Sequence, residues 1–297
     1  MSQMAMTQTD TLYSAAGDTL SESVKKDNHT LYSATGYGSN MIYLGSTISQ
    51  DQPYGYAALS YGFKSSLYLT VSAIHLANYD PFIAFYTGSL GYNHTFNSWF
   101  DISLSVSRYQ VASSLRETLF NNFFYGDITL GIDWKILYTK LSAGSLYMNE
   151  SSMYYQIKNS RYFATPSFFK KKAWISFDPY VNVLFGTIST LETKTDTIVT
   201  VTYPFYKGAG RSGNGNGNGA GSGTGSGSTS TSQTVVTSVL SEKFGIMEID
   251  LGVPISLNTS RFTIEVEPGY VFPMVNETYY PGTKGFVFTL SCYLKIF

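Results

Sequence analysis

Charged side chains are scarce in this chain of 297 residues, of which 13% are Asp, Glu, Lys or Arg, against roughly 25% in ordinary soluble domains. The 19 basic and 20 acidic residues nearly cancel, which leaves a net charge of −1 at pH 7. A protein that binds nucleic acid needs a strongly basic surface, and this balance supplies none. We therefore expect no nucleic-acid partner.

Cysteine and histidine are nearly absent. Cys292 is the one cysteine, so no intramolecular disulfide can form and no CxxC zinc motif exists. The three histidines, His29, His75 and His94, are scattered and form no HExxH motif. We therefore expect no metal site, no cofactor and no catalytic residue, and we predict that the protein is not an enzyme.

Long apolar runs are also missing, and none approaches the ~18 residues that a membrane-spanning helix requires. The first ten residues, MSQMAMTQTD, contain neither the cationic nor the apolar segment of a signal peptide. Either the protein is not exported, or its signal has been removed from this numbering. Two fold classes remain: a soluble all-β protein, and a membrane barrel whose apolar residues are spread over many short strands.

Alternation of apolar and polar residues is the dominant pattern from about Ser39 to the C-terminus. Phe, Ile, Leu and Val share one face of each segment, and mainly Ser, Thr, Gly, Tyr and Asn, with a few Asp and Glu, share the other. The clearest cases are 100–107, 124–134, 173–185, 247–256, 262–267 and 286–296. Several of these segments exceed the roughly five or six residues of an average strand and reach the length that a tilted strand needs to cross a bilayer.

The chemistry of the polar face separates the two remaining fold classes. Lys is rare on this face, whereas the water-exposed face of a soluble sheet normally collects Lys and Glu. Aromatic residues such as Trp99, Phe124, Trp134 and Phe272 gather near the segment ends, where the two membrane interfaces favour them. We therefore predict an all-β fold, namely a transmembrane antiparallel up-and-down β-barrel.

The spacing of the turns predicts about twelve strands. Short links fall at 50–52, 64–66, 78–81, 97–98, 133–135 and 258–260. The count of twelve requires a strand at 153–164 that is followed by a turn at 165–172. If 153–164 is irregular, the alternative is ten strands, and both numbers are even, as in single-chain bacterial barrels.

Two polar regions divide the chain. Residues 1–29 lack large apolar groups and predict a flexible N-terminal periplasmic tail before a barrel at 30–297. The Gly/Ser/Asn-rich run at 208–232 has no apolar surface to offset the entropy of ordering. Because Thr- and Val-rich segments flank this run, we expect an extracellular β-arm with a Gly-rich loop at 187–243.

A short repeat lies near the N-terminus, where TLYSAAG at 11–17 returns as TLYSATG at 30–36. One interpretation is chance in a composition rich in Ser, Thr and Tyr. The other is a duplicated segment that pairs with a sheet edge or with a partner, as added strands do.

Acidic residues converge on the polar face of the last strands. The set is Asp178, Glu248, Asp250, Glu265 and Glu267. A tight turn at 258–260 would place Asp250 and Glu267 nearly opposite each other, where like charges need basic partners, protons or bound cations. One interpretation is a salt-bridged, filled lumen in which Lys140, Lys295 and Arg261 are the partners. The other is an ion pathway whose acidic lining, with Lys140 beside it, favours cations.

The final strand, which ends in Phe297, and the string FGIMEIDLGVPISLNTSRFTIEVEPGYVFP at 244–273 resemble outer-membrane β-barrel proteins of Gram-negative bacteria. The tyrosine-rich, glycine-punctuated strands look most like those of the Bacteroidota, and the resemblance covers about 39–297. It implies a location in the bacterial outer membrane, in contact with outer-membrane lipid. It also implies that the barrel-assembly machinery recognises the last strand through Phe297 and Tyr293.

Two functions remain open at this point. The first is a passive, porin-like channel for small solutes with an acidic, cation-favouring lumen. The alternative is a structural or interaction subunit of an outer-membrane envelope complex. In that case the lumen is filled, and the 187–243 arm and the N-terminal tail contact a protein partner.

Overall fold

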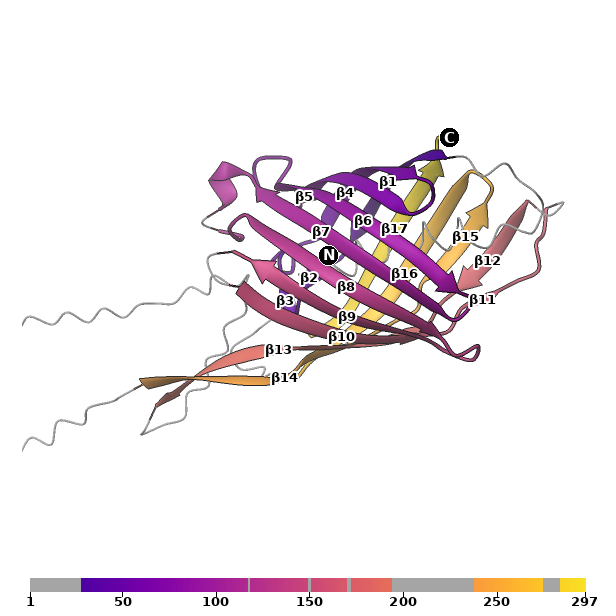
Figure 1. The fold of residues 1–297 in the computed structure, drawn as a ribbon. Coiled ribbons are helices and arrows are strands. Elements are labelled where there is room, and N and C mark those ends of the chain that lie inside the picture. The colour runs from indigo at the N-terminus through magenta and orange to yellow at the C-terminus, as the bar shows by residue number, and fades with distance from the viewer. Residues whose placement is uncertain (1–27, 117, 149–150, 170–171, 194–237, 275–283) are drawn as a thin grey trace, which may run out of the picture.

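The structure is a computed structural model, and it describes residues 28–116, 118–148, 151–169, 172–193, 238–274 and 284–297. Twelve antiparallel strands form a closed barrel (Figure 1). The wall consists of β1 (His29–Gly38), β4 (Tyr54–Phe63), β5 (Leu67–Leu76), β6 (Phe85–Asn97), β7 (Phe100–Val111), β8 (Phe123–Asp133), β9 (Tyr138–Tyr147), β10 (Ser151–Ser160), β12 with β13 (Ala173–Phe177 and Tyr180–Thr193), β14 with β15 (Ser238–Gly252 and Ile255–Thr259), β16 (Phe262–Pro273) and β17 (Gly285–Lys295). The predicted fold class is confirmed.

Each wall strand pairs with its neighbours in the chain, and β1 closes the barrel by pairing with β17. The segment that distinguishes twelve strands from ten is β10, which pairs with β9 and with β13. The short β11 (Phe163–Ala164) follows β10 and pairs with β12. The twelve-strand prediction is therefore confirmed, and the ten-strand alternative is wrong.

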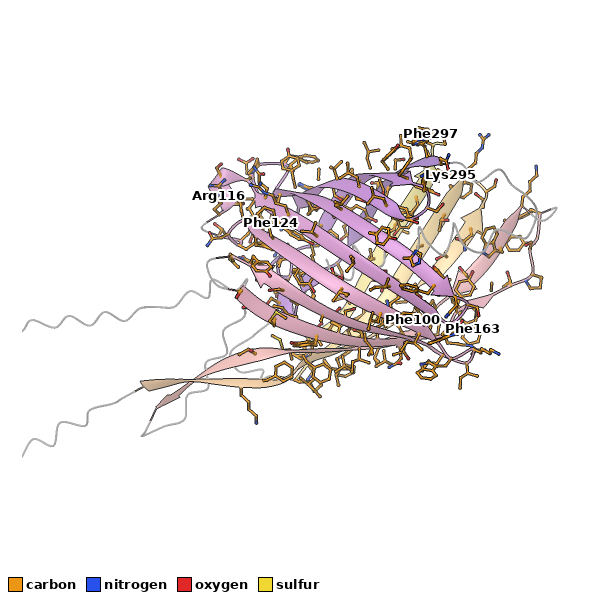
Figure 2. All side chains as sticks on the ribbon, viewed as in Figure 1. Phe100, Arg116, Phe124, Phe163, Lys295 and Phe297 are labelled. Carbon is orange, nitrogen blue, oxygen red and sulfur yellow. The ribbon has the colours of Figure 1, made fainter. Side chains whose placement is uncertain are left out.

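The outward faces of the wall form an apolar belt. These side chains are exposed although they are large and apolar, and they include Leu59, Leu69, Val71, Leu90, Leu104, Val106, Leu251, Ile255, Ile264 and Leu290. Figure 2 shows Phe124 near one end of the barrel and Phe100 and Phe163 near the other, as expected where a membrane has two interfaces. Within the described residues, no helix is long and apolar enough to cross a membrane.

A closed barrel leaves no unpaired strand edge in lipid, and an apolar exterior fits the hydrocarbon region. These two properties make the protein an integral protein of the bacterial outer membrane, as predicted. We call the end that carries the connections 39–53, 77–84 and 112–122 the loop end. The opposite end, with the short turns 64–66, 98–99 and 134–137, is the turn end.

The alternating pattern becomes clear only from about Ser39, but the first wall strand lies before it. The wall begins at β1, which contains the second copy of the repeat at 30–36. In β1 this copy pairs with β17 on one side and with β4 on the other. The first copy, and the predicted tail apart from its last two residues, lie outside the described residues, so both remain predictions.

Residues 39–49, which we call the plug segment, leave the wall and enter the lumen at the loop end. They contain a small hairpin of β2 (Ile42–Tyr43) and β3 (Ser46–Thr47), labelled inside the barrel in Figure 1. Met41, Tyr43 and Leu44 are each at most 3% exposed. Alternation was misleading here because a hairpin that lies inside a lumen is buried on both of its faces.

Aromatic packing holds the plug segment in place. The ring of Tyr43 lies 5.5 Å from Tyr109, 6.0 Å from Phe123 and 5.7 Å from Tyr125, measured between ring centroids. Burial raises the pKa of the Tyr43 phenol well above its ordinary value, so the hydroxyl stays neutral. The wall side chains and the plug segment thus form one apolar core at the loop end.

Asn40 organises the polar contacts of the plug segment. Its Oδ1 accepts hydrogen bonds from Thr47 Oγ1 and Ser49 Oγ, both at 2.7 Å, and its Nδ2 donates to Asp51 Oδ1 at 2.6 Å. Burial raises the pKa of the Asp51 carboxyl, and the hydrogen bond from Asn40 opposes this shift. The base of the hairpin is closed by Ile48 N, which donates to Met41 O at 2.8 Å.

Strands β13 and β14 continue beyond their other neighbours at the loop end. The pairing of β13 with β10 ends at Gly186, while its pairing with β14 continues to Thr193 opposite Ser238. Figure 1 shows this two-stranded extension leaving the barrel. The rest of the predicted arm, 194–237, lies outside the described residues, and its extracellular position remains a prediction.

Candidate functional site

Charged side chains on the inward faces of the wall are mainly acidic. Side chains alternate between the two faces of each strand, and residues paired across strands share a face. By this criterion eight carboxylates and three amines point into the lumen. The acidic residues are Asp101, Asp127, Asp133, Asp178, Glu248, Asp250, Glu265 and Glu267, and the basic ones are Lys140, Lys158 and Lys295. Among the inward-facing side chains of the described wall, carboxylates therefore outnumber amines, although the whole chain is close to neutral.

The pairing of β14 and β15 with β16 differs from the predicted register. The hairpin turn runs from Thr259 to Phe262, so Asp250 lies opposite Val271 and not opposite Glu267. Thr259 Oγ1 stabilises this later turn by accepting a hydrogen bond from Phe262 N at 2.9 Å. The shift is an even number of residues, so all the predicted carboxylates keep their inward orientation.

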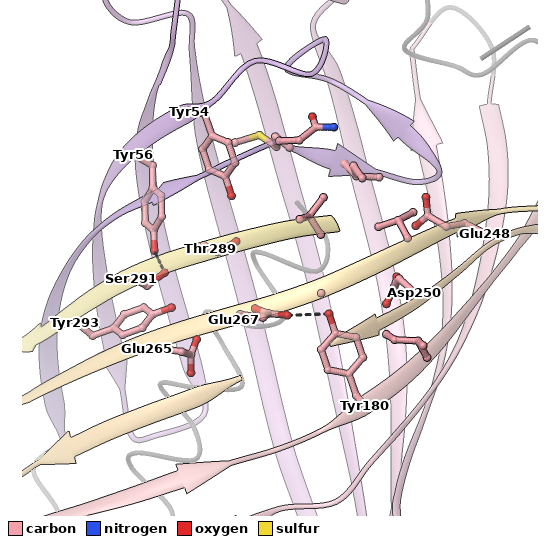
Figure 3. Close-up of a pocket in the computed structure, with 17 residues that line it drawn as sticks. Tyr54, Tyr56, Tyr180, Glu248, Asp250, Glu265, Glu267, Thr289, Ser291 and Tyr293 are labelled. Atoms are coloured by element: carbon pink, nitrogen blue, oxygen red, sulfur yellow. Dashed lines mark hydrogen bonds between the residues drawn. The ribbon is translucent and has the colours of Figure 1, made fainter. Parts of the chain in front are cut away.

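Four of the five predicted carboxylates share one cavity of about 80 Å³, shown in Figure 3. Glu248 and Asp250 come from β14, and Glu265 and Glu267 come from β16. The remaining wall consists mainly of tyrosines and hydroxyls from three other strands, and the plug segment lines one side. These lining residues include Asn40, Met41, Ile42, Tyr54, Tyr56, Tyr180, Thr289, Ser291 and Tyr293.

Neutral donors bind three of these carboxylates. Tyr180 Oη donates to Glu267 Oε1 at 2.8 Å, as the dashed line in Figure 3 marks. Ser256 Oγ donates to Glu265 Oε2 at 2.7 Å, and Asn182 Nδ2 donates to Asp250 Oδ2 at 3.0 Å. Hydrogen bonds from neutral groups stabilise carboxylates without cancelling their charge.

The basic residues proposed as partners do not line this cavity. Lys140 lines a second cavity of about 60 Å³ on the opposite wall, together with Asp127. There Asp127 accepts a hydrogen bond from Ser105 and one of 3.4 Å from Thr129 Oγ1. Lys295, opposite Tyr32 on β1, follows the lining residue Tyr293 by two positions and does not line the cavity. The predicted pathway residues are thus divided between two walls, and Asp178 lines neither cavity.

The last strand has the orientation that its sequence pattern predicts. Cys292 is exposed on the outer face, while Tyr293 is 5% exposed and lines the acidic cavity. Phe297 follows β17 and is 52% exposed (Figure 2). Recognition of Phe297 and Tyr293 by the assembly machinery remains a prediction.

Sequence reasoning missed two parts of the site. Tyr180 was placed on the lumen face, but its packing beside the carboxylates, and the part played by the inward tyrosines of β4, were not predicted, because alternation gives the face of a residue but not its depth. The plug segment was taken for a wall strand. Its sequence did carry a signal, because MIYL at 41–44 is continuously apolar and Gly45 follows with a φ of 78°.

Solved structures resemble this chain at the level of the barrel. The KdgM porin is 11% identical, with 90% of this chain and 98% of that chain covered and a TM-score of 0.43. The NanC porin is 8% identical, with 90% and 100% covered and a TM-score of 0.45. LpxR from Salmonella typhimurium is 8% identical, with 89% and 99% covered and a TM-score of 0.45. Likeness this distant carries no argument about function.

No protein-family model and no curated protein matches the sequence. The assignment to Gram-negative outer-membrane barrels therefore rests on the closed barrel and its apolar belt. The resemblance to Bacteroidota proteins remains a prediction.

Proposed function

We propose that the protein is a non-enzymatic, passive channel of the outer membrane that favours small cations. The observation that carries this proposal is the cavity lined by Glu248, Asp250, Glu265 and Glu267. Carboxylates that line a confined, low-dielectric passage attract cations and repel anions. The plug segment narrows the loop end, so the proposed current is small.

Planar-bilayer recording tests this function directly. The purified protein should give a current in KCl, and a salt gradient across the bilayer should give a reversal potential that indicates K⁺ selectivity over Cl⁻. Silent bilayers at all voltages, with protein that is shown to be inserted, would contradict the channel. A current that favours Cl⁻ would contradict the acidic pathway.

Replacing Glu265 and Glu267 together by Gln should lower the K⁺ over Cl⁻ preference. The change removes two inward charges and leaves side-chain volume and the inward hydroxyl donors nearly unchanged. The measurement is the shift of the reversal potential toward zero. The matched control is Asp80→Asn, which removes one exposed charge from the connection between β5 and β6 and should leave the reversal potential where it is.

A second function is favoured by the packing of the plug segment. Its buried side chains fill the loop end, and β13 with β14 extends beyond the wall at that same end. This arrangement suits an interaction subunit that presents the extension to a protein of the envelope. If so, removal of 208–232 together with 1–27 should abolish co-purification of that partner, whereas unchanged co-purification would contradict the proposal.

A further inference from the structure

Glu248 is one of the deeply buried acidic residues of the cavity. It is 5% exposed, and its Oε2 atom is buried without a hydrogen-bond partner. A β-bulge places it there, because the pairing of β13 with β14 shifts between Leu184 and Phe185. Met247 is the extra residue and is 1% exposed, so Met247 and Glu248 are both enclosed by the barrel. A buried carboxylate oxygen without a donor is costly unless a ligand supplies one.

The cavity as a whole contains more acceptors than donors. None of its described lining residues is Lys, Arg or His. Of the lining hydroxyls, Tyr180 already donates to Glu267, and Tyr56 donates to Ser291 Oγ at 2.9 Å. Lys158 lies 4.0 Å from the centroid of the Tyr180 ring, but it does not line the cavity. A ligand that fits this chemistry is positively charged and brings its own hydrogen-bond donors.

The arrangement of the acidic groups favours an ammonium group over a bare metal ion. Among the described residues, no three His, Cys, Asp or Glu side chains are placed to hold one metal ion. The carboxylates instead come from two strands, and four tyrosines line the same cavity (Figure 3). An ammonium group has three N–H donors for separate acceptors, and aromatic rings attract it further.

We propose that this cavity binds the ammonium group of a small aliphatic amine, with Glu248 as the main acceptor. This inference rests on the proposed cation channel and names the class of cation for which its lumen is built. The volume of about 80 Å³ suits an ammonium group with a short alkyl chain. Asn40, Met41 and Ile42 of the plug segment line the same cavity, so a bound amine contacts both the wall and the plug.

Calorimetric titration of the full-length protein in detergent with ethylammonium chloride tests this proposal. The wild-type protein should bind the amine, and Glu248→Gln should weaken binding by at least about tenfold, because a charge-assisted hydrogen bond is lost. The matched control is Asp127→Asn, which removes an inward carboxylate from the other cavity and should leave the affinity unchanged. Heat-dependent electrophoretic mobility verifies that each variant is folded.

Three results would overturn the proposal. They are equal affinity in the wild type and Glu248→Gln, equal weakening in Glu248→Gln and Asp127→Asn, and displacement of ethylammonium by calcium chloride at a lower concentration than the amine itself requires. K⁺ selectivity is recorded on the same preparations. If the wild-type protein carries a K⁺-selective current but binds no amine, this inference alone is refuted. If the wild-type current shows no K⁺ selectivity, the proposed cation channel is refuted.

Discussion

Replacing residues 42–47 by Gly-Gly should raise the single-channel conductance severalfold. This exchange removes the tip of the plug hairpin, including Tyr43, from the space between Tyr109, Phe123 and Tyr125. The hydrogen bond from Ile48 N to Met41 O holds the two cut ends close together, so two residues can join them. The wall should still close, because its ladder from β1 to β17 does not include the plug segment.

The control for this experiment is Tyr43→Phe, which keeps the ring and removes only the hydroxyl. Its conductance should match that of the wild type, because the ring provides the obstruction. A shortened variant that is folded and inserts but conducts no better than the wild type would show that the plug segment is not the constriction. A silent wild type with a conducting shortened variant would instead favour the interaction subunit with a filled lumen.

Replacing Gly36 by Val should destabilise the barrel where β1 pairs with β17, which we call the seam. A Cβ atom at this position would lie 2.6 Å from the carbonyl oxygen of Leu290 on β17 and would also clash with the ring of Tyr56. The backbone of β17 cannot move away without breaking the pairing that closes the barrel. Overpacking of this kind costs about 1–3 kcal/mol or more, and we expect a lower Tm in detergent and a smaller folded fraction.

Gly88→Val is the matched control for the seam. Gly88 lies on the outer face of β6, and no other atom lies within 4 Å of the position that its Cβ would occupy. The added side chain faces lipid, so the Tm should change little, with an effect within about 0.5 kcal/mol. Equal Tm values for Gly36→Val and Gly88→Val would contradict the close approach of β1 and β17.

The repeat shows how far sequence reasoning reached at this seam. Pairing with a sheet edge was one of the two interpretations of the repeat and chance was the other, and neither assigned the second copy to a particular wall strand. In the structure the second copy pairs with a strand on each side. Its Gly36 lies so close to β17 that a Cβ atom there would clash with the carbonyl oxygen of Leu290. The alternation of apolar and polar residues does not distinguish the strand that closes the barrel from any other strand. Closure depends on pairing between residues more than 250 positions apart.

The acidic site was predicted in part. Side-chain alternation correctly placed Glu248, Asp250, Glu265 and Glu267 on one face, because the face follows from parity alone. Their register was wrong, because it depends on which residues form the turn at Thr259 to Phe262. The bulge at Met247 could not be predicted, since it depends on the pairing of two strands and not on either strand alone.

The amino-acid sequence alone is enough to identify the environment of this protein. Its few charges, its long alternating segments and its apolar faces are local properties of the chain, and they are sufficient to predict a membrane barrel; the spacing of its turns adds a count of about twelve strands. What fills that barrel follows from its three-dimensional fold. The plug segment, the division of the inward charges between two cavities and the burial of Glu248 all result from contacts across the lumen. Such contacts join residues that are remote in sequence, so no local pattern encodes them.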